Sequence, residues 1–370
     1  MLYRSIIRPL LFQLPAESAH EFGLSTLRFA SSNPLTRGFL SRGYSSPPSL
    51  AIERFGLKFT NPVGIAAGFD KNGVAARGLA ALGFGFVEVG TVTHLPQPGN
   101  DKPRLFRLPH DHAVINRLGF NNRGAAALAD RLHRSRPDCV LGVNIGKSKR
   151  VELENAVDDY LASFELVHSV ADYVTINVSS PNTPNLRELQ RPEVLRELLN
   201  TLQFRNRELG AKSGVGPVPL LVKIAPDLRD DELASIIESA VEAGLSGIIA
   251  TNTTVSREGL KSSAEEVASC GAGGLSGRPL TKGSTDMIAK IYRMAGDKLT
   301  IVGVGGVFNA HDAWEKISAG ASLIQIYTGM IYEGAGIARQ INAGLAELLA
   351  QHGFNSLEEA VGSRTASDPA

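Results

Sequence analysis

From residue 63 onward the chain repeats one unit eight times: a short run rich in β-branched residues, a polar or glycine end, and a helical segment. The runs cover residues 63–67, 86–91, 140–145, 173–178, 220–224, 247–251, 299–304 and 323–327. Helical spacing of apolar residues is clear at 157–171, 192–209, 230–243 and 310–319. Gly83, Gly210, Gly244 and Gly320 stand where left-handed caps would end such helices. Eight regular units favour an α/β fold, a closed (β/α)8 TIM barrel, over an open doubly wound sheet.

Composition excludes several classes of protein. Lys and Arg number 38 and Asp and Glu 37, so no strong net field invites a nucleic acid, and we expect no nucleic-acid partner and no obligate protein partner. The two cysteines, Cys139 and Cys270, exclude a disulfide scaffold and a cysteine-based zinc site. No H-E-x-x-H motif occurs and the histidines do not cluster at strand ends, so we expect no metal.

The chain before the barrel reads as two short helices, 1–14 and 16–30, each with one apolar face. Two interpretations stay open: a hairpin packed on the core, or an interfacial anchor whose Arg4, Arg8 and Arg28 meet lipid headgroups. No apolar run approaches the ~20 residues of a membrane span. A Ser/Pro-rich linker covers 41–49, and 50–59 reads as a small β-hairpin that plugs the bottom of the barrel. We therefore expect a helical hairpin at 1–44, a barrel at 45–354 and a disordered polar tail at 355–370.

The expected carboxyl ends of the strands, where barrels carry their chemistry, hold amides, hydroxyls and lysines rather than a carboxylate pair. Each amide alone could equally be a satisfied core residue. Together they suit a flat heterocycle whose edge alternates donors and acceptors, and the lysines suit an anionic group or an electron-rich cofactor. The five amides are Asn116, Asn144, Asn177, Asn182 and Asn252.

Glycines after the seventh and eighth strands indicate a phosphate site. GVGG at 303–306 and YTG at 327–329 place backbone N–H groups where barrels commonly bind phosphate. The glycine-rich loop 273–277 could close over the same group. Long inserts at 94–121 and 255–280 follow strands two and six, so we expect them at the top of the barrel, over the site.

These motifs together resemble those of the class 2, quinone-dependent dihydroorotate dehydrogenases. The resemblance spans residues 1–349 and rests on NPVGIAAGFDK (61–71), GNDKPRLFR (99–107), INRLGFN (115–121), NVSSPNTPNL (177–186), ATNTT (250–254), GGLSGRPL (273–280) and GVGG (303–306). It implies an oxidoreductase that oxidises (S)-dihydroorotate to orotate through one non-covalent FMN and passes electrons to a membrane quinone, in pyrimidine biosynthesis. It also implies a peripheral protein on the cytoplasmic side of the cell inner membrane, in contact with surface lipids.

The resemblance assigns roles position by position. FMN would be held by Ala67, Gly68, Phe69, Asp70, Lys71, Thr91, Asn144, Asn177, Lys223, Thr251, Gly277, Gly306, Tyr327 and Thr328. Dihydroorotate would be held by Lys71, Asn116, Arg117, Leu118, Gly119, Phe120, Asn177, Asn182, Asn252 and Thr253. His20, Arg107 and Tyr327 would mark the inner end of a quinone tunnel lined by Leu10, Leu11, Leu14, Phe22 and Leu27.

The same resemblance makes Ser180 the catalytic base, with Thr183 and Phe120 on the proton's way out. Chemistry alone would not select Ser180, because a hydroxyl is a poor proton acceptor and no histidine stands beside it. Class 1 enzymes carry Cys at this position, so Ser180 and the N-terminal extension favour class 2. Without the resemblance, two alternatives stay open: a flavin-free barrel isomerase or synthase acting on a phosphorylated substrate, and a catalytically idle binding or scaffold protein.

Overall fold

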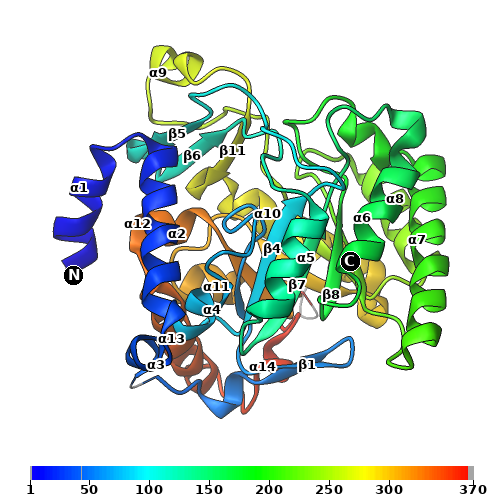
Figure 1. Ribbon diagram of the computed structural model, residues 1–370. Helices are drawn as coiled ribbons and strands as arrows, with labels where there is room; N and C mark the ends of the chain where they lie inside the picture. The colour runs from blue at the N-terminus through cyan, green and yellow to red at the C-terminus, as the bar shows by residue number, and fades with distance from the viewer. Residues whose placement is uncertain (1, 43, 366–370) are drawn as a thin grey trace.

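The computed structural model describes residues 2–42 and 44–365, and its centre is a closed parallel barrel of eight strands (Figure 1). The strands are β3 (Val63–Ile65), β4 (Phe86–Val92), β7 (Val140–Ile145), β8 (Tyr173–Asn177), β9 (Leu220–Lys223), β10 (Gly247–Ala250), β12 (Thr300–Val304) and β13 (Leu323–Ile326). Each pairs with its neighbours in chain order, and β13 closes the ring on β3. All eight predicted runs are confirmed as barrel strands, with differences only at their ends.

Helices on the outside of the barrel follow each strand, and the first seven of them lead to the next strand of the barrel. They are α4 (Ala76–Ala81), α5 (Ala125–Arg134), α6 (Ala156–Val167), α7 (Pro192–Ser213), α8 (Asp230–Glu242), α10 (Thr281–Ala295), α11 (Ala310–Ser318) and α13 (Ile337–Gln351). Gly83, Gly244 and Gly320 have the positive φ expected of caps. The prediction for Gly210 is wrong: it lies inside α7, which continues to a cap at Gly214 with φ of 70°.

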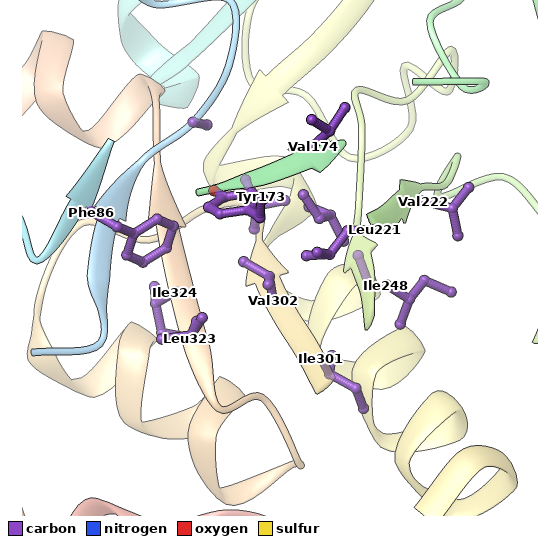
Figure 2. Close-up of a cluster of buried hydrophobic side chains, with 14 of the residues drawn as sticks. Phe86, Tyr173, Val174, Leu221, Val222, Ile248, Ile301, Val302, Leu323 and Ile324 are labelled. Carbon is purple, nitrogen blue, oxygen red and sulfur yellow. The ribbon is translucent and has the colours of Figure 1, made fainter. Parts of the chain in front are cut away.

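The apolar side chains of the strands are buried in one continuous core, part of which Figure 2 shows. Two large rings fit because glycines face them. A Cβ on Gly64 would lie 2.4 Å from the Phe86 ring, and one on Gly142 would lie 2.1 Å from Tyr173. The core at this level is therefore packed without space for a ligand.

A two-stranded hairpin, β1 (Ile52–Arg54) and β2 (Leu57–Phe59), covers the amino-terminal end of the barrel. Its Phe59 meets Phe86 edge to face with centroids 5.5 Å apart, and Phe55 meets Tyr173 at 5.8 Å. Because Phe86 and Tyr173 are the first residues of β4 and β8, these contacts confirm the predicted plug.

The two long inserts meet at the other end, in a sheet that sequence analysis did not predict (Figure 1). Strands β5 (Leu105–Leu108) and β6 (Ala113–Asn116) form a hairpin, and β11 (Gly274–Gly277) pairs antiparallel with β6. The helix α9 (Ala264–Ser269) belongs to the second insert, and α12 (Thr328–Glu333) follows β13. Pairing of Asn116 with Gly274 brings both inserts over the carboxyl ends of the strands.

The N-terminal segment is helical, as predicted, but holds one more helix. A π-helical turn (Tyr3–Ile7) leads into α1 (Arg8–Phe12), followed by α2 (Ala16–Ser32) and the unpredicted α3 (Pro34–Ser41). Helix α2 packs on α4 so closely that a Cβ on Gly78 would lie 2.5 Å from Leu27. Within the described ranges, no helix is long and apolar enough to cross a bilayer.

The expected disordered tail is wrong for residues 355–365. Helix α14 (Leu357–Ala360) buries Leu357 and Ala360 completely, and Arg54 forms an ion pair with Glu358 at 2.7 Å. This segment packs at the amino-terminal end of the barrel, near the β1–β2 hairpin, because two of its four helical residues are apolar and become buried there. The rest of the expected tail, 366–370, lies outside the described residues. The described residues also include six short 3-10 turns, at Pro48–Leu50, Pro109–Asp111, Leu153–Asn155, Leu186–Gln190, Arg278–Leu280 and Gly296–Lys298.

Candidate active site at the carboxyl ends of the barrel strands

A polar cavity opens where the strands end beneath the two inserts. Its lining contains most of the residues expected there from sequence. These are Ala67, Gly68, Lys71, Thr91, Asn116, Leu118, Gly119, Phe120, Asn177, Ser180, Asn182, Lys223, Thr251, Asn252, Thr253, Gly277, Gly306, Tyr327 and Thr328. Five further expected residues, Phe69, Asp70, Arg117, Asn144 and Thr183, are not among the lining residues.

The floor of the cavity is a hydrogen-bonded network of amides and hydroxyls. Thr91 donates to Asn144 Oδ1 at 2.6 Å, and Asn177 Nδ2 donates to Thr91 at 3.0 Å. Asn252 Nδ2 donates to Ser179 at 3.0 Å. Asn144 is fully buried beneath this layer, so it orients Thr91 and Asn177 rather than facing the cavity. Because these donors and acceptors are fixed, the cavity presents a defined polar pattern to a ligand.

Below the amides lies a buried carboxylate, Glu88, to which sequence analysis gave no role. It accepts hydrogen bonds from Asn144, Tyr173, Thr175 and Gln325 at 2.9, 2.9, 3.1 and 2.8 Å. The sequence could have predicted that Glu88 points into the barrel, because Phe86, two residues earlier in β4, also points inward and side chains two residues apart share one face of a strand. Gln325 lines the cavity, and its Oε1 has no hydrogen-bond partner among the described residues.

Two lysines give the cavity its positive charge. Lys71 donates to Asn121 Oδ1 at 2.6 Å; burial, and then the nearby Arg104 charge, lower the pKa of Lys71 to about 7 against the opposing charge of Glu17. Lys223 is 6% exposed, and its ammonium makes no hydrogen bond or ion pair with any described residue. Burial lowers the pKa of Lys223, and the charge of Glu88 opposes that shift. An unpartnered, buried ammonium facing a cavity points to an anionic or electron-rich ligand.

Ser180 faces the cavity from the loop after β8 and is 6% exposed. Its Oγ accepts a hydrogen bond from the backbone N–H of Asn182 at 3.3 Å, and the side-chain Nδ2 of Asn182 donates to Asn116 at 3.0 Å. Thr183 lies behind it, with its buried hydroxyl unpartnered among the described residues. The hydroxyl of Ser180 is therefore held at the cavity wall, and none of its described hydrogen-bond partners is an evident proton acceptor.

The glycines after β12 and β13 form the opposite side of the cavity. Gly305 and Gly306 have φ of 132° and 68°, and a Cβ on Gly306 would lie 2.1 Å from Thr281 Oγ1. Only glycine fits this turn against the start of α10. Ser276 in β11 lies 2.8 Å from Thr328, hydroxyl to hydroxyl, so the predicted approach of loop 273–277 to this end of the cavity is confirmed.

Three of the expected residues have structural roles instead. Asp70 accepts hydrogen bonds from the N–H groups of Val74 and Ala75 at 2.9 and 2.7 Å, which fixes the turn after β3. Arg117 points away and donates to the Pro103 carbonyl. Phe69 packs behind the cavity, between Tyr327 and His20.

A second, apolar cavity of about 370 Å³ lies between the N-terminal helices and the barrel. Of the residues expected at the quinone tunnel, Leu11, Phe22, Leu27, His20 and Arg107 line this cavity. The prediction that Leu10 and Leu14 line this cavity is wrong, since they point outward and are 59% and 44% exposed. Tyr327 lines the polar cavity instead. Phe22 lines the apolar cavity yet is 59% exposed, so the cavity reaches the surface there.

Two basic side chains, His20 and Arg107, line the apolar cavity. Burial, and then the charge of Lys71, lower the pKa of His20 to about 4, so this imidazole is neutral. Arg107 donates to the carbonyls of Leu11 and Phe12 at 3.1 and 3.2 Å, and also to that of Leu14. Arg107 therefore caps the carboxyl end of α1 and ties it to β5.

A parallel eight-stranded barrel with an amide- and lysine-lined cavity at its carboxyl ends, beside an apolar cavity under added helices, defines an enzyme of the (β/α)8 class. Residues 49–349 match the family described as dihydroorotate dehydrogenase. The chain belongs to this family, which confirms the resemblance.

Relatives and solved structures agree along nearly the whole length. A dihydroorotate dehydrogenase (quinone) of Mycobacterium marinum is 50% identical over 98% of this chain and 97% of its own. The protein of that name from Gloeobacter violaceus is 51% identical over 98% of each chain. A crystal structure of the Eimeria tenella enzyme in complex with ferulenol has a TM-score of 0.83 and 39% identity, and covers 94% of this chain and 95% of that one. The predicted barrel is thereby confirmed at full length.

Proposed function

We propose that this chain oxidises (S)-dihydroorotate to orotate through FMN and passes the electrons to a membrane quinone, as a step of pyrimidine biosynthesis. The observation that carries this proposal is the pair of cavities, one polar and one apolar, in a chain of the dihydroorotate dehydrogenase family. The names of the relatives, dihydroorotate dehydrogenase (quinone), support the choice of acceptor.

Family membership indicates a flavin, and the residues of the polar cavity fit one. The buried Oε1 of Gln325 has no hydrogen-bond partner among the described residues. With the Lys223 ammonium, which also lines the cavity, it offers an acceptor and a donor, as a ring that alternates donors and acceptors requires. When bound, FMN would accept a hydride from substrate and release electrons to a second acceptor. Lys71, Thr91, Asn177, Lys223 and Thr251 would contact its ring, and Gly277, Gly306, Tyr327 and Thr328 its phosphate side.

The substrate would lie under the insert loops, against the amides. Asn116, Asn177, Asn182 and Asn252 offer N–H donors and carbonyl acceptors that match a pyrimidine ring's edge, and Thr253 stands next to them. Lys71 would hold the substrate carboxylate through a charge-assisted hydrogen bond, which is stronger than one between neutral groups. Leu118, Gly119 and Phe120 would cover the ring from the insert and keep water out.

Ser180 would take the proton that leaves carbon 5 of dihydroorotate, while the hydride leaves carbon 6. The Asn182 amide holds the Ser180 Oγ in place at 3.3 Å. Because a neutral hydroxyl accepts a proton only if it can pass one on, a second group must follow it. The buried hydroxyl of Thr183, which has no partner among the described residues, is suited to that relay.

The N-terminal helices would supply the quinone's route and the membrane contact. Large apolar side chains stand exposed along them: Leu2, Ile6, Leu10, Leu14, Phe22, Phe29, Leu35 and Phe39. An apolar cavity that reaches the surface among such residues lowers the cost for a long apolar tail of leaving the bilayer.

The basic residues of this segment would contribute unequally to lipid binding. Arg4 forms an ion pair with Glu333, and Arg8 donates to the Tyr332 carbonyl, so both are turned toward the barrel. Arg28 forms no ion pair within residues 2–42 and 44–365 and would be the cation that favours anionic headgroups. We propose peripheral attachment to the cytoplasmic side of the inner membrane through residues 1–44, with 45–365 as the catalytic unit.

The test is orotate formation by the purified protein with a short-tailed quinone, followed by absorbance. The proposal expects continuous orotate formation, beyond one per flavin, only when dihydroorotate and quinone are both present, and no continuous formation when NAD⁺ replaces quinone. Turnover with NAD⁺ alone would contradict the quinone assignment, and a preparation that neither contains nor takes up FMN would contradict the flavin assignment.

A further inference from the structure

The carboxylate of Glu88 is isolated inside the barrel. It is 0% exposed and receives four hydrogen bonds from three other strands: Asn144 on β7, Tyr173 and Thr175 on β8, and Gln325 on β13. All four donors are neutral groups. Within the described residues, no Lys, Arg or His lies close enough to Glu88 for an ion pair. A carboxylate left so deep without a cation is costly, so its place calls for an explanation beyond packing.

The cation that Glu88 does influence is Lys223. Lys223 ends β9 on the cavity side of the amide layer, whereas Glu88 lies beneath that layer in mid-strand. The charge of Glu88 acts on Lys223, opposing the effect of its burial. The two charges therefore form a separated pair across the cavity floor, with the ammonium toward the ligand and the carboxylate behind it.

Glu88 also fixes which way two amides point. It accepts from the NH₂ groups of Asn144 and Gln325, so their oxygens must face elsewhere. The Asn144 oxygen accepts from Thr91 and Asn177, and the Gln325 oxygen is left unpartnered among the described residues, in a side chain that lines the cavity. One acceptor-only group thus sets the polarity of the whole floor.

We propose that Glu88 is a positioning residue that sets the reduction potential of the flavin, by offsetting the Lys223 ammonium and by holding the Gln325 and Asn144 amides in one orientation. The inference rests on the proposed function, that the cavity holds FMN. A reduced flavin carries more negative charge than an oxidised one, so Lys223 favours reduction and Glu88 opposes it. The flavin's strength as an oxidant is then a property of the pair rather than of the lysine alone.

The experiment measures the midpoint potential of bound FMN by equilibration with a reference dye, at a mildly acidic pH that keeps Lys223 charged. Glu88→Gln is expected to shift the equilibrium toward reduced flavin by about tenfold or more, which is about 30 mV upward for a two-electron couple. Lys223→Met is expected to shift it downward, and the double variant to lie closer to the parent than either single variant. Tyr173→Phe removes one hydrogen bond to Glu88 but changes no charge. Its ratio of reduced to oxidised flavin in the same equilibrium should differ from the parent's by less than twofold.

Each contrary result has a distinct meaning. An unchanged or lowered potential in Glu88→Gln, or an equal shift in Tyr173→Phe, would overturn the proposal and leave Glu88 a packing residue. Glu88→Gln leaves the Lys223 ammonium without an opposing charge, so it is the variant most at risk of not folding. In that case the double variant Glu88→Gln/Lys223→Met should fold and bind FMN more tightly than Glu88→Gln, because it leaves no unpaired charge. If the double variant failed to fold while Lys223→Met folded, that result would also overturn the proposal. Absence of FMN from the parent protein would instead contradict the proposed function.

Discussion

The rings of Phe69 and Tyr327 meet edge to face, with centroids 5.6 Å apart and planes at 79°. Tyr327 lines the polar cavity and Phe69 the apolar one, so this contact forms the wall between them. His20 meets the other side of Phe69 with centroids 5.0 Å apart. One layer of aromatic side chains therefore separates the proposed flavin site from the proposed quinone site.

The first prediction concerns this wall. Phe69→Ala removes a buried ring at the inner end of the apolar cavity, so a quinone headgroup would no longer be held in one position. Misplacement of a reactant commonly costs about a hundredfold in rate, and we expect at least about a tenfold loss in flavin reoxidation by quinone. Flavin reduction by dihydroorotate should change little. Stopped-flow measurement of both half-reactions checks this, with Phe204→Ala, at an exposed site on α7, as the control. Equal losses in both half-reactions would contradict the wall's assigned role.

The second prediction concerns the proposed base. Ser180→Ala should leave FMN bound but slow flavin reduction by about 10²–10⁴-fold, because general base catalysis is lost. Ser180→Cys should recover part of the rate, since a thiol forms its anion more readily than a hydroxyl. Ser213→Ala, at the exposed end of α7, should match the parent. Reduction of Ser180→Ala at the parent rate would place the base elsewhere.

The third prediction is a pH dependence of product binding. Lys71 has a pKa of about 7 in the free protein, lowered by burial and then by the Arg104 charge. Its ammonium is present below that pH and is lost above it, so an anionic ligand binds best on the acidic side. The affinity for orotate should be flat below pH about 7 and fall by up to about tenfold per unit above it. Titration of the flavin spectrum with orotate checks this. Lys71→Met should bind weakly and lose the dependence; an unchanged profile in that variant would contradict the assignment.

The fourth prediction concerns membrane binding. Leu35 and Phe39 are 83% and 73% exposed on α3, so their replacement costs the fold little. The double variant Leu35→Glu/Phe39→Glu should bind anionic vesicles at least about tenfold more weakly, because charged groups replace apolar ones at the lipid surface. Phe204→Glu, at an exposed apolar site on the barrel, should bind like the parent. Sedimentation with vesicles gives the answer, and equal binding by all three proteins would refute attachment through the N-terminal helices.

How far the fold follows from sequence depends on the distance between pairing partners. The barrel strands were predictable because each is a short apolar run and successive strands are neighbours. The β5–β6–β11 sheet was not, since β11 pairs with a strand more than one hundred residues earlier and each strand has only four residues. Helix α3 was missed because Pro34 and Gly38 obscure its helical pattern, although Pro34 stands at its first turn.

The candidate site shows the same division. Strand ends identified Thr91, Asn177 and Lys223, because position along a barrel strand decides which residues reach the cavity. Position could not separate facing residues from supporting ones: Asp70 and Asn144 stand beside the site in sequence, but their side chains are used in hydrogen bonds behind it. Ser180 as the base came from the resemblance alone, and it stays a prediction.

We propose above all that dihydroorotate gives its electrons to a flavin in the polar cavity. Anaerobic addition of dihydroorotate to the purified protein, without quinone, reports this transfer through the flavin's visible absorbance. We expect rapid bleaching with one orotate formed per flavin, followed by return of the oxidised spectrum when quinone is added. A protein that binds FMN yet keeps its oxidised spectrum in excess dihydroorotate would show that the electrons do not pass to this flavin.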